Sequence, residues 1–329
     1  MPRYRSNNQF ELFGLVIESE ESLSELVPIE SPTRLEPQIT IRRGVEGSDA
    51  WSRLRPAVRW TLPSGRDYLT SHKTENGYVL HFPALAEFYV DHAGTDIEFR
   101  ALAGIPPETV RHLLLDAVIP LVLGLSGHDV LHASAVVTPH GGCAFIAETG
   151  TGKSTLAASF SSAGHSVITE DCLMLEADEA GVRAWPSYPG FRLWQDSLDR
   201  LRTASTTRTL PLAHYSSKRR LLSGRFATQS HPLSAIYCLK RPLKSSGEDV
   251  REPRVESLSG SERVISIVHH LFCIDPHDPT LLERQFKFVA SIAAKLSILS
   301  LTVPDDFARL DEVREAVISD LQTRSSAVA

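Results

Sequence analysis

The sequence predicts an α/β fold in which a core of interleaved strands and helices follows a smaller, β-rich N-terminal domain. Up to residue 101, short runs such as QITIR, YVLHF and DIEFR are rich in β-branched and aromatic residues, and turn-forming residues separate them. From Pro107 onward, apolar residues recur at helical spacing, and strands then alternate with helices. We therefore place a β-rich domain at residues 1–104 and the core at 105–329, with a helix at 107–125 as the junction.

The composition is that of an ordinary globular protein. The chain has 329 residues, 42% of them hydrophobic, and a net charge of −6, which gives no reason to expect nucleic acid or an anionic membrane as a partner. The two most apolar stretches, 112–125 and 288–301, are shorter than a membrane span, and each contains a charged residue. The first residues lack the apolar core of an export signal, and the cysteines form no CxxC pair, so we predict a cytoplasmic protein with reduced thiols.

The elements of the core can be predicted in order from their apolar patterns and turn residues. A tight turn, PHGG, separates two runs that read as the strands of a hairpin. Pro120 should kink the junction helix, because proline cannot donate a helical hydrogen bond. The predicted elements are strands 132–137 and 143–147, helix 153–163 ended by Gly164, strands 165–169, 172–176 and 233–239, helices 261–272 and 279–296, strand 297–303 and helix 304–323.

The stretch AETGTGKST, residues 147–155, predicts a phosphate-binding loop. It fits the pattern GxxxxGK[ST], with Ala147 in place of the first glycine. In such a loop, backbone N–H groups at a helix N-terminus surround the phosphates, the lysine neutralises their charge and the hydroxyl binds Mg²⁺. An alanine in a left-handed backbone conformation would cost about 1–2 kcal/mol. The nucleotide-binding residues are predicted to be Glu148, Thr149, Gly150, Thr151, Gly152, Lys153, Ser154 and Thr155.

Three further residues are candidates for the same site. Glu170 and Asp171 follow a short strand, and one helix and one strand should return the chain to the edge that holds the loop. One carboxylate could then face Mg²⁺ while the other accepts a proton from an attacking hydroxyl. His132 opens the strand that pairs with the one feeding the loop. The alternatives are an acidic turn between two strands and a structural histidine.

A basic segment, Arg192–Arg225, is a candidate for substrate contact. It holds eight Lys or Arg residues against two acidic residues and has weak secondary-structure signals, so it predicts a loop that binds phosphates or an acidic peptide. Arg192 and Lys218 are the individual candidates, and a solvated loop is the alternative. The histidines of HHLFC, His269 and His270, lack a second pair of zinc ligands, so we expect a helix with two exposed histidines.

Taken together, these residues resemble the HPr kinase family. A histidine that opens a hairpin, the loop at 149–154 and the stretch GHSVITED at 164–171 follow in the family's order and spacing. A weaker similarity covers most of the chain, including LHFPALAEFYVDHAGTDIEFRAL and YPGFRLWQDSL, and resembles the HPr-kinase-like proteins of lasso-peptide biosynthesis clusters. The family usually has two aspartates where this chain has Glu170 and Asp171, and no counterpart of the segment that binds HPr is evident.

The resemblance implies a core of the HPr kinase C-terminal P-loop type, using ATP and Mg²⁺. It implies transfer of the γ-phosphate to a serine hydroxyl, here of a ribosomally made precursor peptide. Glu170 would be the general base, Asp171 would act with Ser154 on the metal side, Lys153 would hold the phosphates and His132 would lie beside the site. The alternatives are a nucleotide hydrolase or switch, a small-molecule kinase and a non-catalytic nucleotide-binding module. Homo-oligomerisation is an open alternative to a monomer.

Overall fold

The computed structural model describes residues 8–30, 33–44, 49–62, 64–201, 209–222, 224–241 and 252–328. The chain divides into two compact units. The first unit comprises Met1–Val130, Leu212–Tyr215 and Phe272–Gln285, and the second unit comprises Leu131–Pro211, Ser216–Leu271 and Phe286–Ala329. The domain boundary predicted between residues 104 and 105 stays a prediction.

The first unit is built on a mostly antiparallel sheet. Its nine described strands lie in the order β3-β1-β2-β4-β9-β8-β7-β6-β5, and the pairs β2–β4 and β4–β9 are parallel. The strands are β1 Asn8–Leu12, β2 Leu15–Ser19, β3 Val27–Pro28, β4 Ile39–Arg43, β5 Val58–Thr61, β6 Asp67–Thr74, β7 Gly77–Phe82, β8 Ala86–Asp91 and β9 Asp96–Ala101. Buried and half-buried residues alternate along β8, as expected for a strand with one face on a core.

A helical segment follows this sheet, where the sequence predicts a junction helix. It consists of α1 Pro107–Leu113, a π-helical turn Leu114–Val118 and α2 Ile119–Leu123. Pro120 lies in the first turn of α2, which follows the π-helical turn. The π-helical turn changes the hydrogen-bond pattern just before the position where proline supplies no N–H donor. The structure therefore has an α-helix, a π-helical turn and a second α-helix where the sequence predicts one helix kinked at Pro120.

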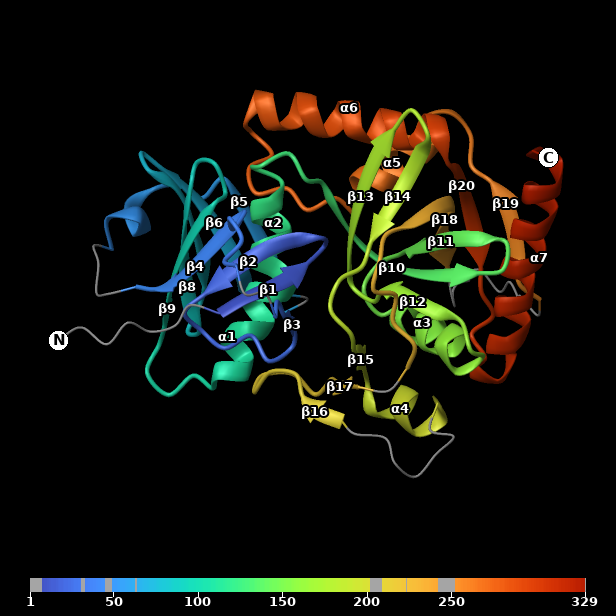
Figure 1. Ribbon diagram of the computed structural model, residues 1–329, viewed down its shortest axis with the longest axis horizontal. Helices are drawn as coiled ribbons and strands as arrows, with labels where there is room; N and C mark the ends of the chain where they lie inside the picture. The colour runs from blue at the N-terminus through green and yellow to red at the C-terminus, as the bar shows by residue number, and fades with distance from the viewer. Residues whose placement is uncertain are drawn as a thin grey trace. The chain divides into compact units, whose positions relative to one another are not determined.

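The second unit is an α/β core whose sheet has eight described strands (Figure 1). Its elements are β10 Val130–Thr138, β11 Gly141–Ile146, α3 Lys153–Ser162, β12 Ser166–Thr169, β13 Cys172–Asp178, β14 Gly181–Trp185, β15 Phe191–Leu193, α4 Gln195–Leu201, β16 Thr209–Pro211, β17 Arg219–Leu221, β18 His231–Lys240, β19 Arg254–Ser257, α5 Gly260–Val268, β20 Ser297–Thr302 and α7 Leu310–Val328. Helix α6, Pro279–Lys295, begins in the first unit and ends in the second. The mixed α/β character predicted from the sequence is confirmed.

Two apolar layers cover the sheet of the second unit. Along β11, Phe145 packs into a cluster that includes residues of α3 and α7, whereas Ile146 packs into a cluster that includes residues of α5 and α6. This alternation follows from the two-residue period of a strand that is buried on both faces. Figure 1 shows α5 and α6 on one side of the sheet and α3 on the other, and both figures show α7 beside β19.

The predicted hairpin and the helix after it are confirmed. Strands β10 and β11 pair antiparallel from Ala133 opposite Ile146 to Thr138 opposite Gly141. Helix α3 ends at Ser162, and Gly164 has the positive φ of +92° that favours glycine after a helix. Of the basic segment, Arg202 and Arg208 lie outside the described residues, and β15, β16 and β17 form a small antiparallel sheet where loop was expected.

Candidate active site at one edge of the sheet

Several strands of the second unit end at the same edge of its sheet. β11 is parallel to β18, and β18 is parallel to β20. β12 runs in the same direction as β11, because both are antiparallel to β10. β10 begins at this edge, where Ala133 lies opposite the last residue of β11. The residues after β11, β12, β18 and β20 therefore gather near the start of β10.

The phosphate loop, Ala147–Thr155, connects β11 to the N-terminus of α3. Gly150 and Gly152 have φ of +86° and +115°, and Gly152 is the N-cap residue of α3. Among the described residues, the non-glycine residues with positive φ are Phe13 and Ala84, so Ala147 carries none of the strain that a left-handed alanine would have. The missing first glycine therefore leaves the loop conformation intact.

Lys153 is buried inside this loop. The residue is 6% exposed, and its Nζ donates a hydrogen bond to the Ala147 carbonyl at 2.5 Å. Burial lowers the pKa of Lys153, while the charges of Asp171 and Glu170 oppose this shift. A buried ammonium group at a helix N-terminus lies close to partial positive charge, so a bound anion would stabilise it.

The two adjacent carboxylates lie in different surroundings. The Glu170 side chain is fully buried, and burial raises its pKa, against the opposing charge of Arg192. The Ser154 hydroxyl is near enough to oppose that rise, yet among the described residues Glu170 Oε1 has no hydrogen-bond partner of ordinary geometry. The Asp171 side chain keeps 20% of its exposure, and one of its oxygens lies 3.5 Å from His132 Nδ1.

His132 is held at the start of β10 by its backbone. Its N–H donates to the His270 carbonyl at 2.7 Å, and the next N–H, of Ala133, donates to the Asp171 carbonyl at 2.9 Å. Burial lowers the pKa of His132, while Asp171 opposes that shift. The predicted residues Lys153, Glu170, Asp171 and His132 therefore lie together, and Glu148 and Ser154 are close enough to act on their charges.

Arg192 forms a buried ion pair with Glu170. Its side chain is 5% exposed, and its guanidinium donates to Glu170 Oε2 through Nη1 at 2.5 Å and to the hydroxyl of Tyr188. Two guanidinium groups lie near the Tyr188 ring, that of Arg192 at 4.8 Å and that of Arg220 at 5.0 Å from the ring centroid. Arg192 and Arg220 are also opposite each other on β15 and β17. The structure thus places the Arg192 side chain against a carboxylate, and its contact with a substrate stays a prediction.

Lys218 lies over the ring of Trp194, with Nζ 5.4 Å from the ring centroid. Trp194 follows β15 and is 47% exposed. The charge of Lys218 acts on both Lys153 and His132, so Lys218 is close to the phosphate loop. Helix α4, directly after Trp194, also approaches the loop, because Ser197 Oγ lies 3.4 Å from Thr155 Oγ1.

Sequence reasoning missed two residues at this edge. The expectation that His270 lies exposed on a helix is wrong: α5 ends at Val268, and His270 is half-buried in the next turn, near the Ala147 carbonyl and Lys153. Arg241 follows β18 and donates to the Thr151 carbonyl at 2.9 Å. Its place after a core strand could have identified Arg241, since the ends of parallel strands share an edge.

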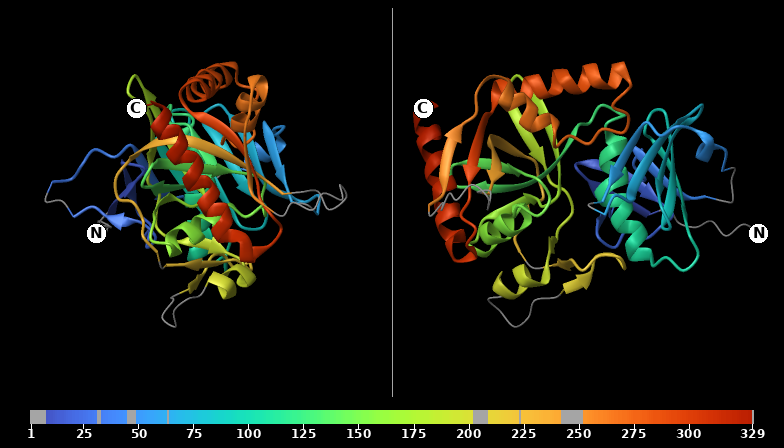
Figure 2. Two further views of the ribbon diagram at one scale, coloured as in Figure 1. Left: turned by 90° about the vertical axis from the view of Figure 1, so that its right-hand side faces the viewer. Right: turned by 180° about the vertical axis from the view of Figure 1, so that it is seen from behind.

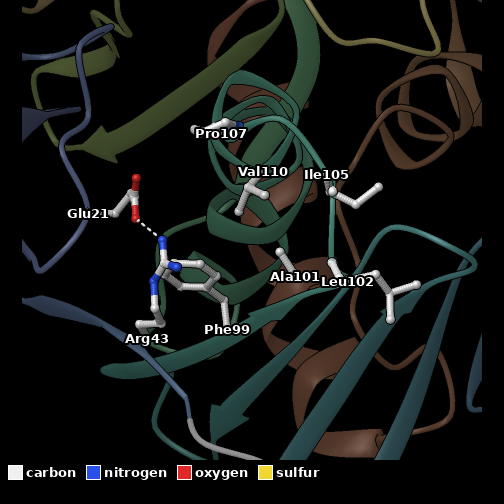
Figure 3. A pocket seen from close by; sticks show the side chains of 10 residues that line it. Glu21, Arg43, Phe99, Ala101, Leu102, Ile105, Pro107 and Val110 are labelled. Carbon is white, nitrogen blue, oxygen red and sulfur yellow. Dashed lines mark hydrogen bonds and ion pairs between the residues drawn. The ribbon is translucent and has the colours of Figure 1, made fainter.

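A separate hollow of about 270 Å³ lies within the first unit (Figure 3). Phe99 of β9 and Val110 of α1 line it, with the connection 101–105 between them. Its charged groups, Arg43 and Glu21, are paired with each other at 2.8 Å. The lining is suited to an apolar side chain, whereas the groups suited to phosphate chemistry gather at the sheet edge of the second unit.

Comparisons with known proteins add little. No protein-family model matches the chain, and no curated protein matches it. Among solved structures, the HPr(Ser) kinase/phosphatase from Coxiella burnetii is similar at 13% sequence identity and a TM-score of 0.32, over 60% of this chain and 96% of that chain. A likeness at this level carries no argument about function. In the described part of the chain, no helix combines the length and the apolar character needed to cross a membrane.

Proposed function

We propose that the second unit is an ATP- and Mg²⁺-dependent kinase of the HPr-kinase-like type, which transfers the γ-phosphate to a serine hydroxyl of a peptide. One observation carries the proposal: buried Lys153, buried Glu170 and the Asp171–His132 pair converge at the N-terminus of a helix. Buried ionisable groups are costly, and their convergence at a helix N-terminus matches what phosphoryl transfer requires. The serine acceptor and its peptide context rest on the resemblance described above.

The residues present fit a magnesium–nucleotide complex. Within the part of the chain that the structure describes, Glu170 Oε1 is a buried carboxylate oxygen with no hydrogen-bond partner of ordinary geometry, and the Ser154 hydroxyl lies near this carboxylate. Carboxylate and hydroxyl oxygens are the protein ligands that Mg²⁺ accepts, alongside water and phosphate. When bound, Mg²⁺ would neutralise charge on the phosphates. Lys153 would leave the Ala147 carbonyl to bind phosphate oxygens, with the backbone N–H groups at the start of α3.

We assign to Glu170 and Asp171 the opposite roles to those that the family resemblance implies. Glu170 is buried, paired with Arg192 and close to Ser154, so it is suited to hold the metal. Asp171 is more exposed and lies beside His132, so it is suited to accept the proton of an incoming serine hydroxyl. His132 would then orient the Asp171 carboxylate or share its proton. Lys218, over Trp194, would contact the acceptor or the transferring phosphoryl group.

The test is phosphorylation of a peptide. The protein, ATP and Mg²⁺ are incubated with a candidate precursor peptide encoded beside the gene, and the peptide is analysed by mass spectrometry, with Lys153→Ala as the control. A gain of one phosphoryl group on a serine, absent with Lys153→Ala, is the expected result. ADP formation without a modified peptide would instead favour a hydrolase or another acceptor. A protein that binds no nucleotide would overturn the proposal.

The carboxylate allocation has its own test. Glu170→Gln should raise the Mg²⁺ concentration needed for half-maximal activity, whereas Asp171→Asn should lower kcat at saturating Mg²⁺. The reverse pattern would restore the allocation that the family resemblance implies.

A further inference from the structure

Arg241 is a cation at the phosphate loop that the mechanism above does not use. Its Nε donates to the Thr151 carbonyl at 2.9 Å, and a Cβ on Gly152 would come within 3.3 Å of its Nη2. The Arg241 side chain therefore lies beside Gly152, the N-cap residue of α3. A cation at the positive end of a helix favours the binding of an anion there.

The fold fixes the position of Arg241. β18 lies beside β11, which feeds the phosphate loop, and Cys238 of β18 is opposite Ile146 of β11. Arg241 follows directly after the last residue of β18, so its backbone is carried by a central strand of the sheet. A side chain on such a support approaches the loop from a defined direction.

The ion pair between Arg241 and Asp305 is weak enough for another anion to replace Asp305. Arg241 Nη1 lies 2.8 Å from Asp305 Oδ1, and the two side chains are 45% and 53% exposed. An exposed ion pair contributes little free energy because water screens it. A guanidinium forms two parallel hydrogen bonds with phosphate oxygens, and hydrogen bonds between charged groups are stronger than those between neutral groups. A phosphate at the loop would therefore compete well with Asp305.

We propose that Arg241 binds a phosphate group of the nucleotide and that Asp305 competes with that phosphate for the guanidinium. This inference rests on the proposed function, because it assumes that the loop binds a nucleotide. Asp305 follows β20, the parallel neighbour of β18, so both members of the pair come from strand ends at this edge. The pair makes nucleotide affinity depend on a residue that does not touch the nucleotide.

The test measures the dissociation constants of a non-hydrolysable ATP analogue and of ADP by calorimetry. Arg241→Gln keeps a donor for the Thr151 carbonyl but removes the charge, and it should weaken binding about tenfold. Asp305→Asn frees the guanidinium and should tighten binding roughly two- to fivefold. The double variant should behave like Arg241→Gln alone. A larger loss for the ATP analogue than for ADP assigns Arg241 to the γ-phosphate, and equal losses assign it to the phosphates that the two share.

A matched control is available in the first unit. Arg42 and Asp96 lie 2.7 Å apart with side chains 56% and 52% exposed, so Asp96→Asn removes an equivalent pair without changing nucleotide affinity. Unchanged affinity in Arg241→Gln, or weaker binding in Asp305→Asn, overturns the inference while leaving the kinase proposal in place. If the unsubstituted protein binds neither nucleotide, both proposals fail together.

Discussion

The ion pair Arg42–Asp96 on the sheet of the first unit and the pair Arg192–Glu170 near the phosphate loop differ in their exposure to solvent. Arg42 and Asp96 are both more than half exposed, whereas Arg192 is 5% exposed and Glu170 is fully buried. Exposed pairs contribute at most about 1 kcal/mol, and buried pairs often cost more in desolvation than their attraction returns. A buried pair is therefore weak evidence for stability, and its place beside a nucleotide loop points to chemistry.

The largest expected effect tests whether the second unit holds reactive carboxylates at all. Asp171→Asn keeps the shape of the side chain but removes its basicity, so phosphoryl transfer should slow by a factor of about 10²–10⁴. Single-turnover rates at saturating ATP and Mg²⁺ measure this loss. Asp96→Asn, on the sheet of the first unit, is the control and should keep the full rate. Equal rates in all three proteins would exclude Asp171 as the base.

The next effect compares the two kinds of ion pair by stability. Arg192→Leu leaves Glu170 buried without its partner, which should reduce the free energy of unfolding by about 3–5 kcal/mol. Arg42→Leu breaks an exposed pair and should cost less than about 1 kcal/mol. Urea unfolding at neutral pH measures both. Similar losses in the two variants would mean that burial does not distinguish the pairs.

A smaller effect is expected for substrate contact. Lys218→Ala removes the cation that lies over Trp194 near the loop, and it should raise the KM of the phosphate-bearing or peptide substrate roughly tenfold. Arg219→Ala removes the same charge from the neighbouring position, where the guanidinium bonds Thr209, and should leave KM unchanged. Steady-state kinetics with each substrate varied in turn identifies which one Lys218 contacts. An unchanged KM for both would remove Lys218 from the site.

The smallest expected effect is a pH dependence of stability that comes from His72, a buried titratable residue of the first unit. His72 is 6% exposed, and both ring nitrogens have partners, the Leu54 carbonyl at 3.1 Å and Thr70 Oγ1 at 3.0 Å. Burial lowers the pKa of His72 below its ordinary value, so the unfolded chain binds more protons in that interval. The corresponding stability is present above about pH 6.5 and is lost as the pH falls below that value.

This pH dependence can be measured with a matched pair of variants. His72→Gln should flatten the decline in unfolding midpoint between neutral and mildly acidic pH, whereas replacement of the exposed His92 by glutamine should leave the decline unchanged. Retention of the full slope in His72→Gln would assign the decline to other groups. The pH dependence of nucleotide affinity should be the same in His72→Gln as in the unsubstituted protein.

Sequence patterns predict the second unit well because its elements carry local signals. The hairpin turn, the GK[ST] stretch and Gly164 each mark a boundary through backbone geometry, and the apolar runs between them have a clear period. The convergence of Lys153, Glu170, Asp171 and His132 could be predicted because strand direction alone places them at one edge. Their functional roles stay predictions.

Other features depend on contacts that no local pattern encodes. The orientation of Arg192 towards Glu170 and Tyr188 is set by a small sheet whose strands are three residues long, too short to give a period. The exposure of His270 was wrongly predicted because its helix ends at Val268, four residues earlier than the apolar pattern suggests. Arg241 carried a positional signal, but its ion pair with Asp305 joins two strand ends that are distant in sequence.

The parallel pairing of β11 with β18 has a consequence for how the chain matures during synthesis. The β10–β11 hairpin and α3 are local and can form as soon as residues 130–162 have left the ribosome, whereas Ile146 meets Cys238 only after a much longer stretch has been made. Until then one side of β11 lacks a neighbouring strand. Ribosome-bound chains that stop before β18 should therefore expose an unpaired edge beside the phosphate loop, which is where a chaperone would be needed first.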